Sequence, residues 1–292
     1  MAIQQNIESL FEKTFSDKIL KKFEKYILYL ASLGFVLHLL IILLNNYNLI
    51  ELSIVGTDLF SNPISALYTP FSFILVYEAF LLVYYIPRSF TTAVGKQYQI
   101  MSLIVIRKIF KDIPLVDLNA NWFENPNNLQ LTYDLLGVLI IFFLIYLFRL
   151  TKEKLPIKPV SEKLDRFIAS KKLVSIVLLP ILFFVCIMSF GNWVHGVFVE
   201  QAFSEDLNNL FFNEFFTIMI LADVFILLMS FQYTERYSQL IRNTGFIIST
   251  ILLRLSFSVS GITSILLIIS GIVFGLIILF IYNLIERDKK TL

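Results

Sequence analysis

Four ionisable side chains lie far inside apolar stretches that are long enough to cross a lipid bilayer. Glu78 and Asp223 are the acids, and Arg107 and Arg254 are the bases. An ionisable side chain near the middle of a bilayer is costly and generally faces another charge or a wet cavity. These four residues are therefore the candidate site, either in an ion pathway or in ion pairs that hold helices together.

The acid and the base recur at matching distances along the chain. Asp223 follows Glu78 by 145 residues (223 − 78), and Arg254 follows Arg107 by 147 (254 − 107), close to half of the 292 residues. At ~1.5 Å of rise per residue, the acid and base of each half lie within one helical turn of the same depth. We therefore predict a Glu78–Arg107 contact and an Asp223–Arg254 contact, each within its own half.

Four more polar residues are secondary candidates: His38, Tyr85, Lys108 and Ser230. Tyr85 shares a helical face with Glu78, and Ser230 shares one with Asp223, in each case seven residues further on. His38 has no counterpart in the second half. A hydrogen-bonded packing role for His38 is therefore favoured over a proton relay.

The composition is that of a polytopic membrane protein. Hydrophobic residues make up 57% of the chain and charged residues 16%, whereas roughly a quarter of a soluble domain is charged. The apolar runs have the length that spans a hydrocarbon core of ~30 Å. The net charge of +2 gives no reason to expect a nucleic-acid partner, and the first 25 residues lack the apolar core of a signal peptide.

We predict an all-α integral membrane protein with eight transmembrane helices, at about residues 26–44, 66–86, 97–114, 131–148, 173–193, 210–231, 244–260 and 262–284. The spans 97–114 and 244–260 each contain an arginine. If both cross, 20 of the 24 Lys and Arg residues fall on one side, and the loops on the other side hold none. The excess of positive charge on the cytoplasmic side of membrane proteins then places both termini in the cytoplasm.

The order of segments repeats, which predicts two parallel-repeat four-helix bundles. The predicted parts are an amphipathic N-terminal helix (1–25), a first bundle (26–148), a basic cytoplasmic connector (149–172), a second bundle (173–285) and a cytoplasmic tail (286–292). In the first part, apolar residues recur three and four apart with lysines on other faces. This pattern predicts a helix at the cytoplasmic membrane surface.

The predicted function is a channel or transporter for protons or a small ion, in the cytoplasmic membrane of a prokaryote. The alternative is a non-transporting structural or accessory subunit that holds a protein or lipid partner, with anionic headgroups meeting the basic rim. The sequence has no His-rich metal cluster, no Gly-rich phosphate loop and no nucleophile–base motif. We therefore expect no enzyme activity, catalytic residue, metal or cofactor.

Two further features bear on association. Gly271 and Gly275 form a GxxxG motif, which can bring two helices of one chain or of two protomers close together. The sequence therefore leaves open whether the protein forms a homo-oligomer. The single cysteine, Cys186, excludes an internal disulfide.

Overall fold

The computed structural model describes residues 2–49, 60, 62–119, 121–153, 162–195, 207–234, 236–259 and 261–288. Regular secondary structure within these ranges is helical. The α-helices are α1 (Ala2–Phe15), α2 (Asp17–Asn46), α3 (Tyr68–Tyr84), α4 (Phe90–Asp112), α5 (Pro126–Glu153), α6 (Glu162–His195), α7 (Leu207–Tyr233), α8 (Tyr237–Leu255) and α9 (Ile262–Asp288). Short 3₁₀ helices lie at η1 (Pro63–Leu67), η2 (Ile113–Leu115) and η4 (Ser256–Ser258).

Seven helical stretches in the described ranges are long and apolar enough to cross a membrane. They are Gln5–Asn46, Pro63–Tyr84, Pro126–Glu153, Asp165–Ser189, Glu214–Tyr233, Tyr237–Ser258 and Ile262–Arg287. The prediction of an all-helical integral membrane protein is confirmed at this level. The one predicted span without a match among these seven is 97–114. It falls mostly in α4, which is long enough to cross a membrane but too polar to be recognised by composition.

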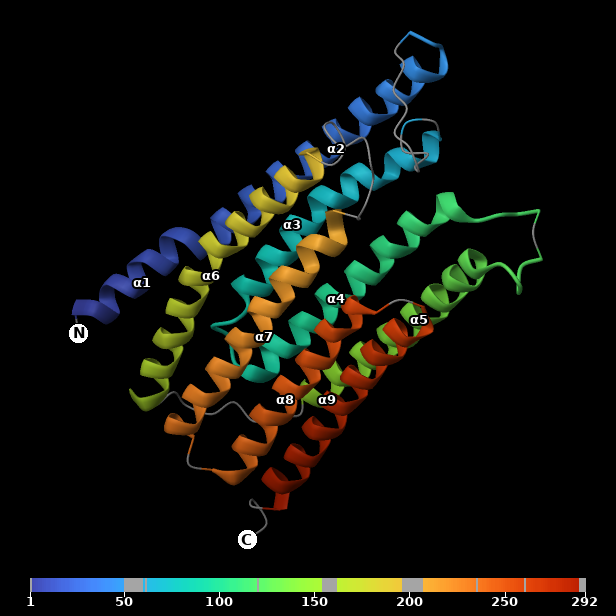
Figure 1. Ribbon diagram of the computed structural model, residues 1–292. Coiled ribbons are helices and arrows are strands. Elements are labelled where there is room, and N and C mark those ends of the chain that lie inside the picture. The colour runs from blue at the N-terminus through green and yellow to red at the C-terminus, as the bar shows by residue number, and fades with distance from the viewer. Residues whose placement is uncertain are drawn as a thin grey trace.

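The long helices run side by side along one common axis, and the start of α1 and the end of α9 lie towards the same end of the bundle (Figure 1). Each helix packs against the next in sequence from α2 to α5, and again from α6 to α9. Between the two halves, α3 packs on α6, α4 on α8 and α5 on α9. The halves therefore form one body with an extensive shared interface.

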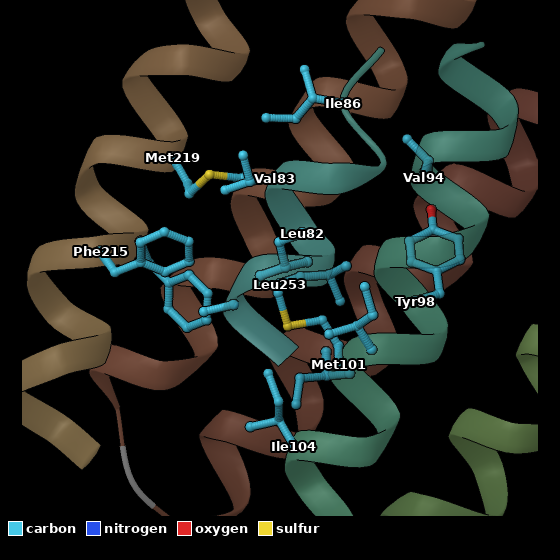
Figure 2. Packing of buried hydrophobic residues seen from close by; sticks show 14 of the residues in the cluster. Leu82, Val83, Ile86, Val94, Tyr98, Met101, Ile104, Phe215, Met219 and Leu253 are labelled. Atoms are coloured by element: carbon cyan, nitrogen blue, oxygen red, sulfur yellow. The ribbon is translucent and has the colours of Figure 1, made fainter. Parts of the chain in front are cut away.

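The middle of this body is formed by α4 and α8, the two arginine-bearing helices. A hydrogen bond of 2.6 Å between the hydroxyls of Tyr98 and Ser249 joins them. Figure 2 shows an apolar core gathered from α3, α4, α7 and α8, including Leu82, Met101, Ile104, Phe215, Met219 and Leu253. The two helices that carry the arginines are therefore surrounded largely by other helices.

The predicted N-terminal amphipathic part, residues 1–25, contains a break. The helix α1 ends at Phe15, and α2 starts at Asp17 after Ser16, whose hydroxyl accepts a hydrogen bond from the Ile19 N–H as an N-cap. Phe15 is buried and stacks on Phe80 of α3 with ring centroids 5.7 Å apart. The apolar face of α1 is thus covered in part by the protein itself.

Several helices extend beyond the apolar runs that predict them. The helix α4 starts at Phe90, seven residues before the predicted start of that span, and Ser89 caps it because the Ser89 hydroxyl accepts a hydrogen bond from the Thr92 N–H. The helix α6 likewise starts at Glu162 and continues through Pro180. Parts of three predicted segments lie outside the described ranges. They are residues 154–161 of the basic connector, residues 196–206 between the fifth and sixth predicted spans, and residues 289–292 of the tail.

Candidate functional site

The first acid–base pair joins α3 to α4. Arg107 Nε lies 3.7 Å from Glu78 Oε2, and both side chains are buried. Arg107 also donates from Nη1 to the backbone carbonyl of Phe71, at 3.3 Å. Glu78 Oε2 has no hydrogen-bond partner among the described residues. The predicted Glu78–Arg107 contact is thus present, as a loose ion pair.

The second acid–base pair joins α7 to α8 and is tighter. Arg254 Nη1 lies 2.6 Å from Asp223 Oδ2, and Thr250 Oγ1 donates to the same oxygen at 2.9 Å. Only 1% of Arg254 is exposed. Its Nε, Nη1 and Nη2 have no hydrogen-bond partner in the described part of the chain, so the 2.6 Å contact is an ion pair without hydrogen-bond geometry. The Asp223 carboxylate therefore supplies the counter-charge on which Arg254 depends.

The two arginines occupy the same register in their helices. Arg107 lies 17 residues after Phe90, the first residue of α4 (107 − 90), and Arg254 lies 17 residues after Tyr237, the first residue of α8 (254 − 237). Long side chains on a helix lean back towards its N-terminus. Each guanidinium can therefore reach the acid on the antiparallel helix that precedes its own.

Both pairs border the apolar core. Leu82 lies one helical turn from Glu78 on α3, Met219 lies one turn from Asp223 on α7, and both side chains belong to the core (Figure 2). Charges in such surroundings interact more strongly than in water, because the local dielectric constant is low. The same surroundings make a charge that loses its partner expensive.

A third ion pair joins α4 to α5. Lys108 Nζ lies 3.6 Å from Asp134 Oδ2; the Asp134 side chain is fully buried, and a third of the Lys108 side chain is exposed. Gln130 Nε2 donates to the other Asp134 oxygen at 2.9 Å. Lys108 is a predicted secondary candidate, and Asp134 is not predicted. Its place inside the predicted span 131–148 is the signal that could have identified it.

The other secondary candidates make contacts that involve neither acid–base pair. His38 Nδ1 and Thr69 Oγ1 are 2.6 Å apart and share a hydrogen bond between α2 and α3. Ser230 donates to a backbone carbonyl of its own helix, at 2.7 Å. The ammonium of Lys96 lies over the Tyr85 ring, 5.5 Å from its centroid. These contacts are those of helix packing.

A buried lysine lies where the predicted connector meets the second bundle. Lys171 is 3% exposed, and its ammonium donates to the backbone carbonyl of Arg88. It also lies over the rings of Phe90 and Phe167, at 4.8 and 5.5 Å from their centroids. Lys171 therefore joins α6 to the turn between α3 and α4.

The GxxxG motif of α9 faces inward. A Cβ atom at Gly271 would lie 3.0 Å from the backbone oxygen of Ser249, and one at Gly275 would lie 1.8 Å from the Tyr98 hydroxyl. Both glycines therefore allow close packing of α9 against α8 and α4 of the same chain.

Comparison with protein families, curated proteins and solved structures finds no match for this chain. Within the described ranges, no three His, Cys, Asp or Glu side chains are placed to hold a metal ion. The buried ion pairs are thus the features from which a function can be inferred.

Proposed function

We propose that the protein moves protons or another small ion across the membrane, as a channel or transporter. The observation that most supports this is the duplication of a buried acid–arginine pair at one register of the two central helices. Apolar side chains pack as well as or better than a buried ion pair. Ionisable groups at this depth generally mark ion or proton pathways. In this proposal a buried carboxylate binds the ion, and the arginine paired with it balances its charge after the ion leaves.

The proposal includes eight membrane crossings, with α4 as the eighth. Helices α3, α5 and α8 pack around α4, so protein rather than lipid covers much of its surface. A helix inside a bundle can carry charges that lipid would exclude. The matching packing order of α2 to α5 and of α6 to α9 supports two parallel repeats of four helices.

The orientation we propose has both termini in the cytoplasm. The N-terminus of α2, the α3–α4 turn, the C-terminus of α5 and the N-terminus of α6 lie at one end of the bundle (Figure 1), and each carries basic residues. Exposed lysines near the start of the chain would meet anionic headgroups there: Lys13, Lys18, Lys21, Lys22 and Lys25.

Flux in proteoliposomes tests the function. Purified protein is reconstituted and an imposed pH or voltage gradient is relaxed, comparing wild type with Glu78→Gln and Asp223→Asn. We expect wild type to exceed empty liposomes and the Glu78→Gln variant to fall to their level. Wild-type flux equal to that of empty liposomes contradicts the proposal.

A non-transporting membrane subunit is the second candidate. The closed contact of Asp223, Thr250 and Arg254 inside an apolar core favours it, because polar groups buried between helices also serve to hold them together. Absence of flux combined with a large loss of stability on breaking the pairs would favour this candidate.

A further inference from the structure

The two buried carboxylates are held in different ways. Asp223 Oδ2 forms an ion pair with Arg254 Nη1 at 2.6 Å and accepts a hydrogen bond from Thr250 Oγ1 at 2.9 Å. Glu78 Oε2 faces Arg107 Nε at 3.7 Å, beyond hydrogen-bond distance, and has no hydrogen-bond partner in the described ranges. A proton that binds Asp223 Oδ2 must displace two close contacts, whereas one that binds Glu78 Oε2 displaces no hydrogen bond.

The two arginines differ in the same sense. Arg107 keeps the Phe71 carbonyl as an acceptor whatever the state of Glu78. Arg254, which is fully buried, has its ion pair with Asp223, while none of its three guanidinium nitrogens makes a hydrogen bond among the described residues. Neutralising Asp223 would therefore leave a buried cation uncompensated, which costs far more than loosening a pair that has other support.

The surroundings of the two pairs differ as well. Lys108 follows Arg107, is partly exposed, and leads to Asp134 and Gln130 near the start of α5. In the second half, the residue after the arginine is Leu255. Lys108, Asp134 and Gln130 thus form a polar group between α4 and α5, one residue along α4 from Arg107.

The chemistry of the first pair favours a proton over a metal cation. Hard cations such as Ca²⁺ and Mg²⁺ take about six or more oxygen ligands. A proton needs a single carboxylate oxygen. Within the described residues no three acidic, His or Cys side chains are grouped to hold a metal ion, and Glu78 shares its site with a guanidinium.

We propose that Glu78 alone is the proton-exchanging carboxylate, reached through Lys108 and Asp134, and that Asp223 and Arg254 form a permanent brace. This rests on the proposed function. In the exchange step, a proton forms an O–H bond with Glu78 Oε2, the carboxylate becomes neutral, and Arg107 stays on the Phe71 carbonyl. Release of the proton to the other side restores the ion pair.

Two measurements test this proposal, and together they distinguish a failure of the transport function from a failure of the Glu78 assignment. In proteoliposomes, Glu78→Gln is expected to abolish proton flux with a small change in melting temperature. Lys108→Leu introduces the residue type that follows Arg254 in the second half, and it is expected to slow proton flux. The double variant Asp223→Leu, Arg254→Leu removes both charges of the brace and is expected to fold and to retain flux. A folded double variant without flux overturns the proposal, as does normal flux in Glu78→Gln or equal flux driven by a sodium gradient.

The second measurement does not need flux. Infrared difference spectra between low and high pH record the carbonyl band of a protonated carboxylic acid. Every carboxyl group that titrates contributes to this band, so the contribution of Glu78 is the difference between the spectra of wild type and Glu78→Gln. We expect this difference to show the loss of one component, and we expect that component to be kept in the Asp223→Leu, Arg254→Leu variant. If wild type moves no protons but shows this pattern, the transport function fails and the assignment of Glu78 stands. Identical bands in wild type and Glu78→Gln overturn the assignment.

Discussion

Replacing Asp223 by Asn would leave the Arg254 guanidinium buried without a counter-charge, because the described residues offer it no other acceptor. Breaking a buried pair in this way costs about 3–5 kcal/mol, whereas replacing both partners with apolar residues is often neutral or stabilising. We expect Asp223→Asn to be strongly destabilising and Asp223→Leu, Arg254→Leu to recover most of the loss. Unfolding in detergent micelles as a double-mutant cycle measures both.

The matched cycle in the first half is Glu78→Gln, Arg107→Gln and the double variant. Its coupling energy should be smaller, since the two charges are 3.7 Å apart and Arg107 has the Phe71 carbonyl. Strictly additive losses in either cycle would mean that the two residues of that pair do not interact.

The His38–Thr69 contact should behave as packing. Thr69→Val removes the hydroxyl at nearly constant volume and is expected to cost about 1 kcal/mol or less, the typical net value of one hydrogen bond between membrane helices. Thr69→Ser keeps the hydroxyl and serves as the control. Flux should be unchanged in both variants; a loss of flux in Thr69→Val alone would give His38 a part in transport.

At the residue scale, the sequence predicts the two main pairs and misses three other buried charges, Asp134, Lys171 and Glu286. Glu78, Arg107, Asp223 and Arg254 stand out because each lies well inside a predicted span. Lys171 does not stand out, because it lies just before the apolar run of the fifth predicted span. An apolar run marks the part of a helix that lies in lipid, and the helix itself can start earlier. Lys171 is therefore assigned to the predicted connector, although it lies within α6.

At the scale of the helices, the glycine with least room for a side chain in the described ranges is Gly275, which packs against the Tyr98 hydroxyl. Gly275→Ala would place a Cβ atom 1.8 Å from that oxygen, so we expect the overpacking cost of about 1–3 kcal/mol. Gly191→Ala in α6 is the matched control, since nothing lies within 4 Å of its Cβ position. Thermal unfolding of both variants gives the comparison.

A second substitution, Tyr98→Phe, tests whether the Tyr98 hydroxyl is the cause of the cost expected for Gly275→Ala. Tyr98→Phe removes the oxygen that the new methyl group meets, while the ring carbon behind it would still lie 3.1 Å away. We expect Tyr98→Phe to restore part of the stability in the Gly275→Ala background and to lower it in wild type, where the bond to Ser249 is lost. A Gly275→Ala variant as stable as Gly191→Ala would contradict this packing.

The helices differ in how well composition identifies them. Those that face lipid on one side, such as α2 and α9, are apolar over their whole middle. The central helix α4 is covered by α3, α5 and α8, so its side chains need not match lipid. Hydropathy measures contact with lipid, and for that reason it detects the outer helices more readily than the inner ones.

At the scale of the whole molecule, eight crossings can be tested by labelling. Leu118, between α4 and α5, is 82% exposed, and Glu153 at the end of α5 is also exposed. On a Cys186→Ala background, an impermeant maleimide added to intact cells should label Leu118→Cys. It should label Glu153→Cys only after permeabilisation. The reverse pattern would mean either that α4 does not cross or that the whole chain has the opposite orientation.

The sequence predicts an all-helical membrane protein and the order of its seven long apolar helices, because each of these needs only a local apolar run. It does not predict how the halves meet. The contacts of α3 with α6 and of α4 with α8 join residues far apart in the chain, and their specificity lies in details such as the Tyr98 hydroxyl against Gly275. Such complementarity has no periodic signature in one sequence.

The packing of α1 has a consequence for synthesis. This helix lies mainly on α6, where the Lys172 ammonium contacts the Glu8 carboxylate at 2.5 Å and lies over the Phe11 ring. Lys172 is made 164 residues after Glu8 (172 − 8). At ~5–20 residues per second, the ribosome needs roughly ten to thirty seconds to supply it. For that time α1 is without its main partner, so it docks only after the second half has begun to insert.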